Sequence, residues 1–154
     1  MRKLGLAFGV FAVVLGPGAL AAQDADAPDT NVITISKFHV PAGEDRAKVM
    51  EFIDKVIVPT SHANPNILSY RVALHYYGAS STEIALIAEY PDWNAVEAPC
   101  GAPCEEWTEA NWPDEGTPEY EQMAELQAAW NKAYMGGHGH SDEVYSVRMD
   151  RAKN

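Results

Sequence analysis

The segment RVALHYYGASSTEIALIAEY, from Arg71 to Tyr90, alternates between apolar and ionisable side chains. A period of two residues is typical of β-strands whose two faces differ in chemistry. The even-numbered positions are apolar almost throughout, and GASS in the middle is typical of a turn. The pattern predicts two antiparallel strands, with one face on the core and the other either solvated or lining a pocket. The polar groups at odd-numbered positions are Arg71, His75, Tyr77, Glu83 and Glu89.

The alternation also predicts how these two strands pair. All even-numbered residues share one face only if even-numbered residues of one strand pair with even-numbered residues of the other. Such pairing requires a loop with an odd number of residues, such as residues 79–81. A slip by one residue would place Leu74 and Leu86 on opposite faces. We therefore expect both leucines to face the helices.

Two further strands and two helices are predicted on either side of this hairpin. Residues 31–40, NVITISKFHV, are rich in β-branched and aromatic residues and predict a strand. Apolar residues at three-four spacing in 41–59 predict a helix that ends at Pro59. Thr117 and Gly136 are expected to bound a second helix.

The last predicted strand covers residues 143–149. Its odd-numbered residues, Tyr145, Val147 and Met149, share one apolar face, so Ser146 and Arg148 are expected on the opposite, uncovered face. Residues 91–118 hold three tryptophans and two cysteines, which predicts an ordered insertion with short helical turns rather than a flexible linker.

The order of these elements predicts an α+β fold. It is the ferredoxin-like βαββαβ plan, with a four-stranded antiparallel sheet, both helices on one face and a long ordered insertion before the second helix. Because the helices cover one face only, the other face has no cover from its own chain. A single domain is expected over residues 31–150.

The N-terminal residues predict export. MRK is followed by an apolar run that Gly and Pro interrupt, and then by small residues, as in a secretory signal peptide over residues 1–21. The run is too short and too broken to favour a membrane anchor. Residues 22–30 are acidic and predict a flexible leader. A signal peptide of this kind predicts that the mature protein is in the periplasm or outside the cell.

Charge and cysteine content narrow the partners. Removal of residues 1–21 takes away Arg2 and Lys3 and no acid, so the formal charge changes from −11 to −13. Such a chain repels nucleic acid and anionic membranes, which favours a small molecule or a protein as partner. Cys100 and Cys104 in APCGAPC predict a disulfide that closes a surface loop; a metal or redox pair is the alternative.

Two segments resemble the dimeric α+β barrel group, which includes antibiotic-biosynthesis-monooxygenase-type, EthD-like and stress-responsive proteins. They are FHVPAGEDRAKVMEFIDKVIVPT, in residues 38–60, and IALIAEYPDWNAVEA, in residues 84–98. The resemblance implies a homodimer and a site for a small, often aromatic, molecule. It implies a cofactor-independent monooxygenase or related proton-transfer enzyme; a non-catalytic envelope dimer and a metal- or haem-binding protein are the alternatives.

The candidate catalytic residues lie on the uncovered face. Arg71 is expected to hold a substrate carboxylate or phenolate, His75 to act as a general base and Tyr77 to donate to a developing oxyanion. If the face is instead a solvated sheet surface, the same residues form ordinary cross-strand pairs. The expected substrate-binding residues are Glu89, Arg148 and His39, with His39 near His75.

A Gly-flanked histidine pair is the second candidate site. His138 and His140, with Asp142 or Glu143 nearby, are suited to bind copper or zinc weakly. The sequence does not place a third ligand, and the other interpretation is a simple turn. We expect no resident cofactor; copper, zinc or haem, bound through His75 or this pair, is the alternative.

Overall fold

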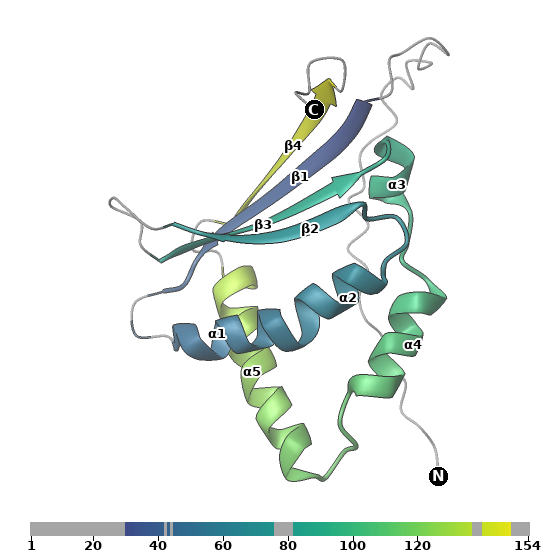
Figure 1. Cartoon of the computed structure of the whole chain (residues 1–154). Helices are drawn as coiled ribbons and strands as arrows, with labels where there is room; N and C mark the ends of the chain where they lie inside the picture. Colours follow the sequence, from purple (N-terminus) through teal and green to yellow (C-terminus); the bar gives the residue numbers. More distant parts are fainter. Residues whose placement is uncertain (1–29, 42, 44, 76–81, 137–139, 149–154) are drawn as a thin grey trace, which may run out of the picture.

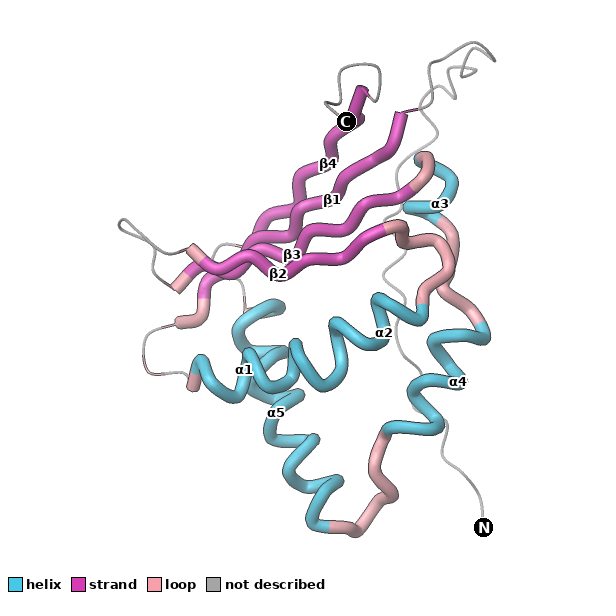
Figure 2. The backbone as a smooth tube through the Cα atoms, viewed as in Figure 1, coloured by secondary structure: helices cyan, strands magenta, loops and turns pink. Residues whose placement is uncertain are grey.

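The computed structural model describes residues 30–41, 43, 45–75, 82–136 and 140–148. It contains a four-stranded antiparallel sheet with strand order β2-β3-β1-β4, and helices cover one face (Figures 1 and 2). This is the predicted ferredoxin-like α+β plan, and the sheet does not close on itself. The strands are β1 (Thr30–His39), β2 (Ser69–Leu74), β3 (Glu83–Tyr90) and β4 (Ser141–Arg148).

The predicted pairing of β2 with β3 is confirmed. Val72 pairs with Leu86 and Leu74 pairs with Ile84, so even-numbered residues meet even-numbered residues. Ile84 and Leu86 are buried, whereas Leu74, on the edge strand, is 48% exposed. An even or odd residue number therefore identifies the face on which a strand residue lies, but the distance from the sheet edge decides how deeply the residue is buried.

The first helical segment is longer than predicted. It runs through α1 (Arg46–Phe52), the π-helical turn η1 (Ile53–Ile57) and α2 (Val58–Ala63). The prediction that Pro59 ends the helix is wrong. The Val58 amide donates to the carbonyl of Ile53, five residues back, so the helix widens immediately before the proline. A widened turn accommodates a ring and a missing N–H that would interrupt a regular α-helix.

The insertion is ordered and helical, as predicted. It contains α3 (Trp93–Glu97) and α4 (Ala102–Asn111), and α5 (Pro118–Met135) follows. Cys100 and Cys104 form the predicted disulfide, with 5.8 Å between their Cα atoms. Thr117 caps α5 by accepting a hydrogen bond from the Tyr120 amide.

The core lies between the sheet and the helices. Phe38 of β1 is fully buried and meets the rings of Trp130 and Tyr134 edge-on, at centroid distances of 5.3 and 5.4 Å. The apolar stripe of α1 contributes Val49 and Phe52. Even-numbered sheet residues therefore form what we call the helix side, and odd-numbered ones form the outer face.

Several predictions fall on parts of the chain that are not described. They concern the signal peptide, the acidic leader, the loop 79–81, Tyr77 and His138. Within the described residues, no helix has both the length and the apolar character needed to cross a bilayer.

Candidate functional site

The outer face carries most of the predicted site residues. Arg71 and Glu89 belong to its odd-numbered register positions, and His75 follows β2 with its amide donating to the Glu83 carbonyl. Arg71 and His75 are exposed. They pair with different parts of β3, Arg71 with Ile87 and His75 with Glu83, and their catalytic roles remain predictions.

Glu89 is the best-anchored acid on the outer face. Its carboxylate accepts hydrogen bonds from Asn31 Nδ2 at 2.6 Å and from Ser69 Oγ at 2.9 Å. These two bonds, and then the nearby charge of Arg71, hold the pKa of Glu89 below its usual value. The contacts join three neighbouring strands, which is a structural role for a residue predicted to bind substrate.

The two predicted histidines of the outer face are not neighbours. His39 pairs with Glu83 across β1 and β3, with 3.6 Å between His39 Nε2 and Glu83 Oε2. His75 lies on the opposite side of Glu83, next to the edge strand β2. The expectation that His39 and His75 sit on adjacent strands is therefore wrong, because β3 separates them.

Arg148 does not share the register positions of the outer face. It pairs with Thr30 and so belongs with the even-numbered, helix-side residues. The odd-numbered residues Tyr145 and Val147 instead lie on the outer face, opposite Ile33 and Asn31. The prediction that Arg148 lies on the uncovered face with Arg71 and His75 is therefore wrong.

The centre of the outer face is apolar. Cross-strand pairing brings Ile33, Ile35, Ile87 and Ala85 together there, and all four are only partly exposed. Beside them Lys37 Nζ donates to Glu143 Oε1 at 2.5 Å, and the hydroxyl of Tyr145 donates to the same carboxylate. The bond from Lys37, and then that from Tyr145, lowers the pKa of Glu143.

The helix side contains a polar chain that the sequence did not predict. Ser36 Oγ donates to Asp142 Oδ1 at 2.5 Å, and His140 Nε2 lies 3.2 Å from the same oxygen. The hydroxyl of Tyr134 is hydrogen-bonded to Ser36. The polar chain Tyr134–Ser36–Asp142–His140 thus links α5, β1 and β4.

An aromatic stack lies directly against the polar chain. The rings of Trp130 and Tyr134 are stacked at 4.6 Å, and the ring of His140 lies 4.2 Å from that of Tyr134. Burial raises the pKa of the Tyr134 hydroxyl, an effect that the Ser36 hydrogen bond partly offsets. Tyr134 therefore stays protonated at neutral pH and is suited to donate a hydrogen bond.

The polar chain opens to solvent along the edge strand β4. The side chain of Asp142 is 60% exposed, that of His140 is 26% exposed, and Val144 is 48% exposed. Ser146, next along the same face, is also exposed. We call Asp142, Val144 and Ser146 the β4 strip; it is an exposed edge of the helix side, where a ligand can reach the polar chain.

This arrangement is suited to acid–base chemistry. Asp142 is placed to orient the His140 ring and to stabilise it when it carries a proton, while Tyr134 provides a neutral donor. The predicted metal site is only partly placed, because His138 is not described. Among the described residues no group of three or more His, Cys, Asp or Glu side chains could hold a metal ion.

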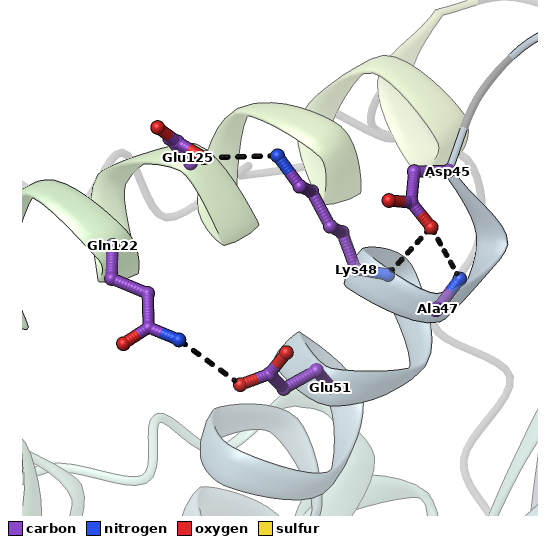
Figure 3. A network of polar contacts seen from close by, with 6 residues as sticks. All are labelled: Asp45, Ala47, Lys48, Glu51, Gln122 and Glu125. Atoms are coloured by element: carbon purple, nitrogen blue, oxygen red, sulfur yellow. Dashed lines mark hydrogen bonds and ion pairs between the residues drawn. The ribbon is translucent and has the colours of Figure 1, made fainter.

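A second polar network joins α1 to α5 on the outside of the helical layer (Figure 3). Asp45 caps α1, Lys48 Nζ lies 2.9 Å from Glu125 Oε2, and Gln122 Nε2 donates to Glu51 at 3.5 Å. Lys48 and Glu125 also line a shallow depression between the two helices. Its charges compensate one another, which is consistent with helix packing rather than with ligand binding.

Comparison with known proteins gives fold-level likenesses only. No protein-family profile and no curated protein sequence matches the chain. Among solved structures, Rv0793 from Mycobacterium tuberculosis shares 20% identity, with a TM-score of 0.46 over 80% of this chain and 99% of that one.

Two other similar structures carry descriptive names. A proposed antibiotic biosynthesis monooxygenase from Caulobacter crescentus shares 10% identity, with a TM-score of 0.47 over 78% of this chain and 92% of that one. An EthD family protein from Bacillus halodurans shares 13% identity, with a TM-score of 0.43 over 75% and 96%. These are kinds of protein that the sequence resemblance named. Likeness at this level does not establish an activity, a ligand or an assembly.

Proposed function

We propose that the protein binds a small aromatic molecule at the β4 strip and transfers a proton there. The observation that supports this most strongly is the polar chain Tyr134–Ser36–Asp142–His140, which runs beside an aromatic stack and opens to solvent at Asp142. Four polar side chains in one connected chain beside the core favour a chemical role.

In this proposal His140 accepts a proton from a hydroxyl of the substrate. Asp142 holds the ring through Nε2 and stabilises the imidazolium that forms. Tyr134 stays hydrogen-bonded to Ser36, whose own proton goes to Asp142, and so helps to hold the carboxylate in place. The imidazolium then stabilises the oxyanion that remains on the substrate. The electron-rich anion could then react with dioxygen, as in cofactor-independent oxygenation, or be reprotonated at carbon, as in an isomerisation.

We also propose that the protein acts as an exported homodimer without a resident cofactor. The partly exposed apolar centre of the outer face supports a second copy as its cover, because buried apolar area drives association. Export rests on the N-terminal sequence pattern. Intact mass of protein recovered from outside the cytoplasm would test it, with a mature N-terminus expected after Ala21 or Ala22.

The outer face offers a second candidate site. Arg71 and His75 share one side of the sheet, and the pKa of Glu89, near Arg71, is lowered. A second copy over this face would enclose them. In that case His75→Ala would remove turnover and leave folding intact, whereas a purely structural dimer predicts no measurable change.

Binding of p-cresol, a small neutral phenol, tests the helix-side site. Its affinity can be followed by tryptophan fluorescence, because Trp130 stacks on Tyr134, and by calorimetry. We expect His140→Gln to weaken binding about tenfold, the loss of one good hydrogen bond. His62→Gln on α2 is the matched control and should bind as the wild type does. Unchanged affinity in His140→Gln would overturn the proposal, and a loss in His75→Ala alone would move the site to the outer face.

A further inference from the structure

We infer that the aromatic ligand of the β4 strip carries an ammonium group, which Asp142 binds. This inference rests on the proposed function and adds the charge class of the ligand. It depends on how the register distributes charge between the two faces of the sheet, and on which oxygen of Asp142 is already engaged.

Charged residues of the sheet are segregated by parity. Lys37, Arg71, Glu83, Glu89 and Glu143 all occupy odd-numbered, outer-face positions. On the helix side, among strand residues whose side chains the structure describes, Asp142 is the one formally charged group. A ligand placed between Asp142 and Val144 therefore meets one negative charge among the described strand side chains, and Arg148 lies at the far end of β4.

The carboxylate of Asp142 is available to a ligand. Among the residues that the structure describes, its hydrogen-bond partners Ser36 and His140 both use Oδ1, and the side chain is 60% exposed. An ammonium at Oδ2 would form a charge-assisted hydrogen bond.

The rest of the β4 strip is suited to the aromatic part of such a ligand. Val144 is two residues beyond Asp142 on the same face, about 7 Å along the strand, which is the span of a short aromatic amine. Val144 is 48% exposed and provides apolar surface for a ring. Thr34, its partner on β1, adds a hydroxyl.

Anionic ligands are disfavoured at the same place. A carboxylate beside Asp142 would find no lysine or arginine close by among the described side chains, since Lys37 is on the outer face and Lys132 lines the depression between α1 and α5. Arg148 shares the helix-side register but is six residues further along β4, about 20 Å away along the strand. The formal charge of the whole chain, −11, adds to the repulsion. The expected order of affinity is therefore amine, then neutral phenol, then acid.

Three ligands with one ring system test this order: tyramine, p-cresol and 4-hydroxyphenylacetate. They would be titrated by calorimetry against the full chain at fixed, near-physiological ionic strength. We expect tyramine to bind at least tenfold more tightly than p-cresol, and the acid more weakly than both. An acid that binds as tightly as tyramine would overturn the inference without any variant being needed.

Asp142 and Glu143 are adjacent in the sequence and lie on opposite faces of the sheet, so they provide a matched pair of variants. Asp142→Asn should abolish the advantage of tyramine over p-cresol, whatever its effect on the affinity for p-cresol itself, and Glu143→Gln should preserve that advantage. If both variants lose the affinity advantage of tyramine over p-cresol equally, the overall charge of the chain and not Asp142 attracts the amine, and the inference is wrong. If none of the three ligands binds the wild type, the proposed function itself falls; if p-cresol binds but tyramine has no advantage, only the inference does.

Discussion

The two faces of the same sheet differ in what their polar groups do. On the outer face, Lys37–Glu143 and Asn31–Glu89 are contacts between neighbouring strands around an apolar centre. On the helix side, the polar chain runs from α5 through β1 to β4, where the exposed carboxylate of Asp142 joins Ser36 to His140. The comparison teaches that many ionisable groups on one face need not mark a site, whereas a few connected ones beside a core can.

The two faces also differ in exposure. Helix-side residues in the middle of the sheet, such as Phe38 and Ile84, are fully buried, and exposure rises only at the edge strands. The outer face is partly exposed throughout its centre, at Ile35 and Ile87 for example. A second copy is expected to cover the outer face, and a small ligand the open edge of the helix side.

The largest effect is expected from core residues on the helix side. Phe38→Ala should lower the free energy of unfolding by about 3–5 kcal/mol, because it leaves a cavity beneath Trp130 and Tyr134. Ile35→Ala, on the same strand and the opposite face, is the control and should cost less in a dilute monomer. Urea unfolding would measure both. Similar losses for the two variants would contradict the assignment of the core to the helix side.

Association should depend on the outer face. Ile87→Arg is expected to weaken self-association at least about 100-fold, because a charge buried in an apolar interface is costly and symmetry repeats it. Sedimentation at micromolar concentration would then show one chain instead of two. Ala128→Arg, on the exposed surface of α5, is the control. A dimer that survives Ile87→Arg would show that copies associate elsewhere or not at all.

A smaller, pH-dependent effect is expected from Glu89. Its pKa is lowered in the folded state from the usual 4.5, so its contribution to stability is present above that pH and is lost as the pH falls through the folded pKa. Glu89→Gln should cost about 1 kcal/mol or less at pH 7, given its partial exposure. The difference from wild type should shrink below about pH 4.5. A difference that stays constant down to pH 3 would mean that the carboxylate charge plays no part.

Local patterns predicted much of the fold. Alternation in residues 71–90 specified the pairing of β2 with β3, and Thr117 and Gly136 marked the limits of α5. The spacing of Cys100 and Cys104 predicted their disulfide. Each of these features depends on residues close together in the sequence, which is why a single chain reveals them.

Non-local pairing explains what was missed. Ser36 and Asp142 are 106 residues apart, and only the register of β1 with β4 brings them together. In the sequence, the polar chain was indicated only by Ser36 and Asp142 themselves, two polar residues at even-numbered positions. Arg148 was placed on the wrong face because Tyr145 and Val147 are apolar, yet they lie on an outer face that is itself apolar at its centre. Apolarity does not identify the core face when the other face is also apolar at its centre.

Ligand-induced changes in backbone amide NMR shifts test the central claim most directly. With tyramine added to the full chain, the account predicts the largest shifts at His140, Asp142 and Val144 and in the last turn of α5 near Tyr134. Arg71, His75 and Glu89 should change little. Shifts concentrated at those three outer-face residues, with none along β4, would contradict it.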